Sequence, residues 1–188
     1  MTFAPVEDSI PSFSDDGRFL YFTSERTGTF QIWKTPVSGG DATATQVTLD
    51  GGAVALESPG GQHLYYTKMR SGTSSLWRMA LPHGVPERVV EGVASRAFQV
   101  LDHGIYYLES DTTAVQPGMG ALAGVGVLRS DEGARLQFFD FSDGKSRTLA
   151  HLKGPVEIGL AVSRDGRKVL YTQVDDISSD LMMLENFR

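Results

Sequence analysis

Residues 14–23 read SDDGRFLYFT, and residues 58–67 read SPGGQHLYYT. The glycines of these two stretches, Gly17 and Gly61, lie 44 residues apart, and Trp33 and Trp77 are separated by the same 44 residues. Different segments that share one offset are the mark of an internal structural repeat. The chain is therefore predicted to contain similar units of about 44 residues.

Two weaker copies follow further along the chain. Residues 102–108 read DHGIYYL around Gly104, and residues 163–172 read SRDGRKVLYT around Gly166. Gly61 and Gly166 are 105 residues apart, which corresponds to two periods plus about 17 extra residues. The third copy lacks the Ser-x-x-Gly pattern, and the extra residues are expected in it, as an insertion at residues 110–134.

Each copy has the local pattern of β-structure. Aromatic and β-branched residues fill 19–23, 64–67 and 169–172 without the 3.6-residue spacing of an amphipathic helix. Glycine and aspartate ahead of them are typical of tight turns, since glycine adopts positive φ and aspartate bonds the local backbone. Further short strands are expected at 45–49, 87–90 and 147–149, and no helix is predicted. The predicted repeat-turn residues are Asp16, Gly17, Gly61, Gly104, Asp165 and Gly166.

Four short antiparallel strands that recur every 40–50 residues are typical of a β-propeller, in which each unit is one blade. One small sheet cannot hide both of its faces from water, but neighbouring blades can cover them. We expect a single all-β domain over residues 1–188, with about four four-stranded antiparallel blades. Their predicted bounds are 11–49, 54–90, 97–149 with the insertion, and 157–188.

The number of blades leaves two arrangements open. The fourth unit lacks an outer strand, and residues 2–6 are the candidate to fill that place in a small closed ring. In the other arrangement the chain is half of a larger ring, and its end blades expose apolar sheet faces that favour self-association. A homodimer with a two-fold axis would then close the ring.

The repeat resembles the WD-like propeller repeats of the TolB type. The resemblance rests on PSFSDDGR at residues 11–18, FTSERTG at 22–28 and QVT at 46–48. Residues 170–188 are similar to the C-terminal end of propellers found in bacterial sensory kinases and winged-helix regulators. This resemblance implies a non-catalytic module for sensing or protein binding, because the family pattern carries no catalytic residues. Related propellers precede the hydrolase domain of dipeptidyl peptidase-type enzymes, and no such domain is present in this sequence.

Composition excludes several classes of protein. The chain has 188 residues, a formal net charge of −6 and no cysteine. Such an acidic chain repels phosphate, so no nucleic-acid partner is expected, and disulfides and thiolate metal sites are excluded. No signal peptide and no apolar segment of spanning length is recognised, so no membrane insertion is expected. The compartment stays open: cytoplasmic as given, or periplasmic if the chain is part of an exported protein.

The sequence contains no recognisable catalytic or cofactor-binding pattern. No Gly-x-Ser-x-Gly nucleophile motif occurs, and the four histidines, His63, His83, His103 and His151, lack metal-binding spacing. No catalytic residue, cofactor or metal is predicted. The alternative is a propeller-type lyase or hydrolase, in which histidine and aspartate side chains of the channel would hold a metal.

Two further sets of residues have predicted roles. Trp33 and Trp77 occupy matching positions and are expected to pack between blades. The insertion is longer than an ordinary loop and is expected to cap the channel or contact a second subunit. Its predicted ligand or partner residues are Met119, Leu122, Val125 and Arg129. The expected partner at the channel mouth is a protein, a peptide or a small ligand, with a homodimer as a further possibility.

Overall fold

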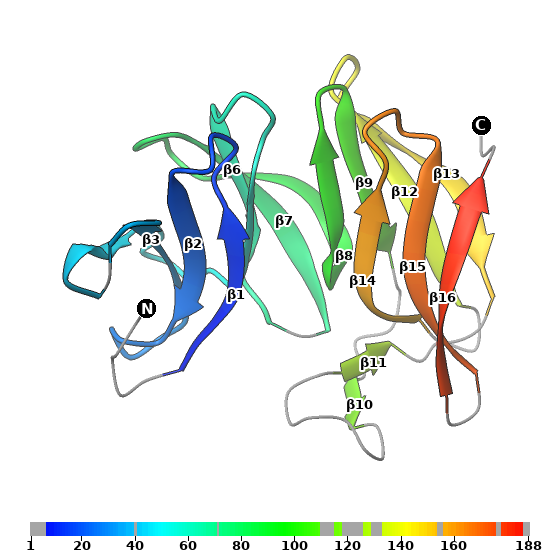
Figure 1. Cartoon of the computed structure of the whole chain (residues 1–188). Helices are drawn as coiled ribbons and strands as arrows, with labels where there is room; N and C mark the ends of the chain where they lie inside the picture. The colour runs from blue at the N-terminus through cyan, green and yellow to red at the C-terminus, as the bar shows by residue number, and fades with distance from the viewer. Residues whose placement is uncertain are drawn as a thin grey trace. The chain divides into compact units, whose positions relative to one another are not determined.

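The computed structural model describes residues 7–39, 41–70, 72–109, 115–117, 126–128, 133–153, 156–175 and 178–185. Most of these residues lie in antiparallel strands, which confirms the predicted all-β class (Figure 1). Within the described ranges, the helical residues are those of η1 (Asp41–Thr43), a single 3-10 turn. The chain divides into two compact units, Met1–Arg70 with Ser75–Val89, and Ser71–Ser74 with Val90–Arg188.

The first unit contains two sheets. The first sheet has the order β1-β2-β3-β4, and each strand is antiparallel to its neighbour. The second sheet follows with β5-β6-β7 and the beginning of β8. Their bounds are β1 Asp8–Phe13, β2 Phe19–Ser24, β3 Gln31–Pro36, β4 Thr45–Gln46, β5 Val54–Glu57, β6 His63–Thr67, β7 Thr73–Ala80 and β8 Glu87–Leu101.

The second unit also contains two sheets. The third sheet consists of the remainder of β8 with β9, β12 and β13, and the fourth has the order β10-β11-β14-β15-β16 (Figure 1). By hydrogen bonding the described strands form three sheets, one of them seven-stranded with the order β13-β12-β9-β8-β7-β6-β5. We treat the two halves of that sheet, divided within β8, as the second and third sheets. The remaining bounds are β9 Gly104–Glu109, β10 Val115–Pro117, β11 Gly126–Leu128, β12 Ala134–Asp140, β13 Lys145–Leu152, β14 Val156–Val162, β15 Lys168–Asp175 and β16 Ser178–Glu185.

Three details differ from the sequence expectation. The strand expected at residues 45–49 is only the two-residue β4, because Thr48 turns inward to bond Gln31 and the backbone of Ile32. The strand expected at 87–90 is the start of the fifteen-residue β8. The insertion was expected to be a loop, yet it contains the antiparallel hairpin β10–β11. Residues 2–6 lie outside the described part of the chain.

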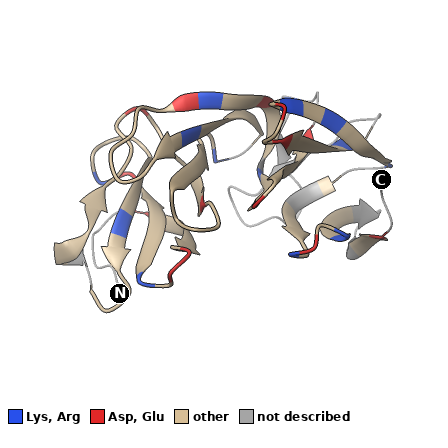
Figure 2. Ribbon diagram, turned by 90° about the horizontal axis from the view of Figure 1, so that it is seen from above, with Lys and Arg blue, Asp and Glu red and all other residues tan. Residues whose placement is uncertain are grey.

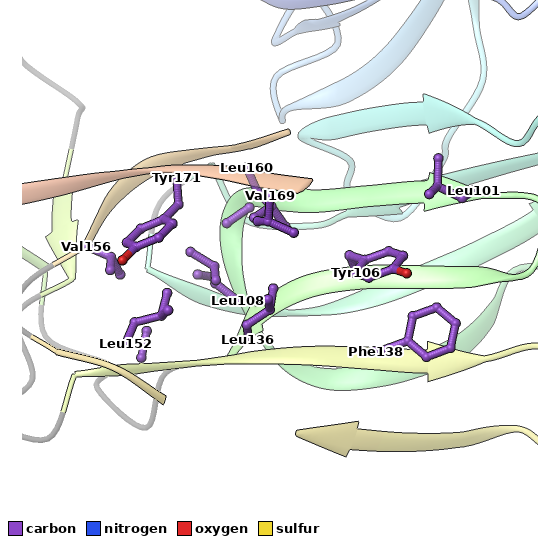
Figure 3. Packing of buried hydrophobic residues seen from close by; sticks show 13 residues of the cluster. Leu101, Tyr106, Leu108, Leu136, Phe138, Leu152, Val156, Leu160, Val169 and Tyr171 are labelled. Atoms are coloured by element: carbon purple, nitrogen blue, oxygen red, sulfur yellow. The ribbon is translucent and has the colours of Figure 1, made fainter. Parts of the chain in front are cut away.

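Each unit has a core between its two sheets. In the first unit, Tyr21 and Ile32 of the first sheet pack against side chains of the second sheet, which are Ala55, Leu64, Tyr66 and Met79. In the second unit, thirteen buried residues fill the space between the third and fourth sheets, including Leu108, Leu136 and Val169 (Figure 3). Full burial of one such side chain contributes about 1.5–3 kcal/mol, so these cores hold each pair of sheets together.

Candidate functional site

Three of the predicted repeat turns have one shared geometry. In the turns that begin at Ser14, Ser58 and Ser163, the serine carbonyl accepts a hydrogen bond from the glycine N–H three residues later, at 2.8–2.9 Å. The serine Oγ accepts another from the N–H five residues later, at 2.9–3.1 Å. The glycines of these turns have φ near +68°, which L side chains rarely adopt. The serine and the glycine therefore close each hairpin in the same way.

The aspartates of these turns are held by the turn itself. Asp16 accepts from the Arg18 backbone N–H and from the Ser14 hydroxyl, and these bonds hold its pKa well below the usual range. In the last turn the Ser163 hydroxyl and a backbone N–H hydrogen-bond Asp165 and lower its pKa. Both carboxylates are exposed acceptors for their own backbone, as expected for Asx-type turns.

The third turn, at Gly104, is built differently. Leu101 pairs directly with Gly104, so two residues, Asp102 and His103, form the whole turn. Gly104 is the first residue of β9, and its φ lies outside the left-handed region. Glycine is needed there because a Cβ would approach the Phe139 carbonyl oxygen. This turn therefore shares its position with the others but not their hydrogen bonding.

A buried polar cluster centres on Glu57, at the end of β5. The Glu57 side chain is 7% exposed and accepts from the Tyr21 hydroxyl at 2.5 Å. It also accepts from the Asp15 backbone N–H at 2.8 Å, and the Lys34 Nζ lies 3.9 Å from it. Burial, then the bond to Glu57, raises the pKa of Tyr21 far above its usual value. Asp15 in turn accepts from the Gly60 backbone N–H at 2.9 Å, so polar contacts join the first and second sheets.

The two tryptophans are both half-buried and each lies beside a cation. The Arg26 guanidinium is 4.8 Å from the ring centre of Trp33, and the Lys68 Nζ is 4.1 Å from that of Trp77. Trp77 also packs against the buried cluster of the first unit. Cation–π contacts of this kind stabilise by about 0.5–1 kcal/mol at partly exposed sites.

An apolar groove lies on the face of the first sheet that carries Leu20. Its volume is about 370 Å³, and Pro11, Phe13, Leu20, Phe22 and Val37 contribute to its lining. Phe13 is 64% exposed and Val37 is 53% exposed. Large apolar side chains in such a concave exposed surface are typical of binding sites. This groove is the candidate site, and no motif in the sequence indicates it.

The partner residues predicted in the insertion, Met119, Leu122, Val125 and Arg129, lie outside the described residues. The described parts of the insertion pair β10 with β11, and Leu128 of β11 pairs with Val156 of β14. The insertion thus adds two short strands to the edge of the fourth sheet (Figure 1).

The four histidines are far apart in the sequence and differ in their exposure. His63 is half-buried at the start of β6, whereas His83, His103 and His151 are exposed. Among the described residues, no three His, Asp or Glu side chains come together as a metal site would require. Both acidic and basic residues occur along the ribbon of the described residues (Figure 2). No helix of the described part has the length and apolar character to cross a bilayer.

Comparison with known proteins places this geometry in context. No protein-family model matches the chain. The Tol-Pal system protein TolB of Bordetella pertussis is 48% identical over 42 residues, which are 22% of this chain and 10% of that protein. The solved structure of TolB from Acinetobacter baumannii has a TM-score of 0.66 at 20% identity, over 97% of this chain and 41% of that one. Oligogalacturonate lyase from Vibrio parahaemolyticus has a TM-score of 0.61 at 12% identity, over 92% of this chain and 48% of the lyase.

These likenesses confirm the predicted TolB-type β-propeller fold. The chain spans less than half the length of both solved proteins. At 20% identity and below, the likeness concerns the fold alone. Because the same fold occurs in a TolB and in a lyase, it does not specify an activity by itself.

Proposed function

We propose that this chain is a non-catalytic β-propeller module that binds another protein. The observation that carries this proposal is the apolar groove on the first sheet, where Phe13 and Val37 expose more than half of their surface. Water contact with such side chains is unfavourable, at roughly 25 cal/mol per Å² of apolar surface. A protein partner that covers the groove would remove this cost.

The polar groups of the repeat support a structural role more than a catalytic one. Asp16 and Asp165 bond the backbone of their own turns, and Glu57 bonds Tyr21 and Asp15. A catalytic acid or base must reach a substrate, and these carboxylates are instead engaged in holding the fold. Met119, Leu122, Val125 and Arg129 of the insertion are proposed as additional contacts for the partner.

Site-specific photocross-linking tests the proposal. Benzoylphenylalanine is placed at Phe13, at Leu122, or at the control position Val85, which is 88% exposed and outside the groove. After irradiation of the cells that produce the protein, we expect one discrete protein adduct at Phe13 and none at Val85. A Phe13 variant that gives no more adduct than the Val85 variant would contradict protein binding at the groove.

A metal-dependent lyase or hydrolase is the competing function, and it makes an opposite prediction. Elemental analysis of the purified protein would then find a calcium or transition-metal ion in stoichiometric amount. The binding-module proposal expects no such stoichiometry, and it expects unchanged cross-linking after treatment with a chelator.

A further inference from the structure

The repeat lets one position be compared in all four sheets. Leu20 of the first sheet corresponds to Leu64, Ile105 and Val169 in the next three. The three later residues are each 0% exposed, whereas Leu20 is only half-buried and lines the groove. In the first unit, Leu64 shares a buried cluster with Tyr21 and Ile32 of the first sheet. Phe22 on the same face as Leu20 is already buried, at 4% exposed. The part of the Leu20 face around Leu20, Phe13 and Val37 therefore has the pattern of a surface that another sheet covers.

The other face of each sheet, which carries the residue after the Leu20 position, is less buried in the fourth sheet than in the first three. Tyr21, Tyr65 and Tyr106 occupy one repeat position in the first three sheets and are 0%, 2% and 6% exposed. The matching residue of the fourth sheet is Leu170, which is half-buried.

The neighbouring strand confirms this difference. Phe138 pairs with Tyr106 and is 2% exposed, whereas Met183 pairs with Leu170 and is 55% exposed. Ala161, which also pairs with Leu170, is exposed. The Leu170 face of the fourth sheet, which consists of Ala161, Leu170 and Met183, has the pattern of a surface that would cover another sheet.

We propose that the partner is a second copy of this chain, and that the Leu170 face of one copy packs on the Leu20 face of the other. This inference rests on the proposed function, because it names the protein that occupies the groove. The proposed contact has the same arrangement as the contact inside one chain, in which the Tyr21 face of the first sheet packs on the Leu64 face of the second.

The contact between the first and second sheets within one chain, the internal contact, can be compared with the proposed contact between two copies. The residues at equivalent repeat positions differ on both sides of the contact in a matched way. In the internal contact, Tyr21 and Lys34 of the first sheet meet Glu57 of the second. In the proposed contact, the same three repeat positions hold Leu170, Met183 and Phe13. The polar donors are replaced by apolar side chains on one face, and their acceptor is replaced by an apolar side chain on the other. Such a match favours a second copy over an unrelated polar partner.

The turns at the rim are complementary as well. In the internal contact, the carboxylate of Asp15 accepts from the backbone of Gly60. The corresponding positions in the proposed contact hold Arg164 on the fourth sheet and Asp16 on the first. Both residues are exposed, and their opposite charges would attract each other across the two copies.

Charge variants on the two faces test this arrangement. Phe13→Lys alters one face and Met183→Glu the other, while Val85→Lys is the control, and circular dichroism checks that each variant folds. Light scattering of the full chain is expected to give twice its 20.4 kDa mass. Each face variant alone should weaken association at least about tenfold. Mixing the two face variants should restore the dimer, because one contact is unaltered and the other pairs a lysine with a glutamate.

The outcomes separate this inference from the proposed function. A wild-type chain of 20.4 kDa at every concentration would overturn the second-copy proposal. So would a dimer that Phe13→Lys dissociates and Met183→Glu does not, because the groove would then pair with itself. A Phe13 cross-link to a protein of another mass would overturn the second copy and leave protein binding intact. Absence of any adduct would overturn protein binding itself.

Discussion

The contact between the first and second sheets is partly polar, whereas the contact between the third and fourth sheets is apolar. In the contact between the first and second sheets, Glu57 accepts a hydrogen bond from Tyr21 and lies near Lys34. The residue at the same repeat position in the fourth sheet is Val162, which packs against the buried cluster of the second unit. The two units thus use one packing geometry with different chemistry. The position of a residue within the repeat determines which residues it contacts in the neighbouring sheet. The chemistry of these residues determines how strongly the two sheets are held together.

The largest expected effect is in the apolar contact. Leu136→Ala removes a 0% exposed side chain from the core between the third and fourth sheets (Figure 3). The free energy of unfolding should fall by about 3–5 kcal/mol, because the tightly packed surroundings cannot fill the cavity. Urea unfolding at neutral pH measures this loss, with Leu49→Ala, at an 85% exposed position, as the matched control. A loss no larger than that of the control would mean that this core is not packed as described.

Substitutions in the polar contact around Glu57 should reduce the free energy of unfolding by less, and the effects of changing Glu57 and Tyr21 should be coupled. Glu57→Ala leaves the buried Tyr21 hydroxyl without its acceptor, and we expect a loss of about 2–3 kcal/mol in unfolding free energy. A double-mutant cycle of Glu57→Gln with Tyr21→Phe should give a coupling energy of at least about 0.5 kcal/mol. Strictly additive effects would show that the two side chains do not stabilise each other.

The turns allow a second comparison between the units. A Cβ at Gly104 would lie 2.5 Å from the Phe138 ring, so Gly104→Ala should cost about 1–3 kcal/mol through overpacking. At Gly17 the space is open but φ is +69°, so Gly17→Ala should cost only about 1 kcal/mol through backbone strain. The same denaturation measurement compares both variants. The reverse order of losses would mean that the third turn resembles the others after all.

The smallest expected effect concerns the exposed turn aspartates. Because folding lowers the pKa of Asp16 and Asp165, their stabilising contribution is present above the unfolded value of about 3.9 and is lost as pH falls below it. The Asp16→Asn, Asp165→Asn double variant should therefore lose less stability between about pH 4 and pH 2 than the wild type. Urea midpoints along this range measure the difference, with Asp102→Asn as the control. An unchanged acid profile would refute the role assigned to the two turns.

The strands could be predicted because their signals are local. Aromatic and β-branched residues next to Ser-x-x-Gly turns specify β2, β6 and β15, and the shared offset of 44 residues arranges them as repeats. The hairpin β10–β11 could not be predicted, since β11 joins the fourth sheet through Leu128 and Val156, a pairing with no local pattern.

The candidate site was harder to find from the sequence. Phe13 and Val37 have the local pattern of ordinary strand and turn residues. Only the structure shows that both are exposed and line a groove together with Leu20. Glu57 likewise has no local signal, because its partners Tyr21 and Lys34 belong to the preceding repeat. Only the comparison of burial at equivalent positions distinguishes the covered faces from the Leu20 and Leu170 faces.

Disulfide trapping tests the central claim most directly, because the chain contains no cysteine of its own. The Ser12 hydroxyl donates to the Ala55 carbonyl at 2.6 Å, so Ser12→Cys with Ala55→Cys in one chain serves as the internal control. The equivalent pair across two copies is Ala161 and Pro11. A mixture of Ala161→Cys and Pro11→Cys chains is predicted to form a covalent dimer on oxidation, and neither chain alone should do so. An internal disulfide with no dimer in the mixture would contradict the account.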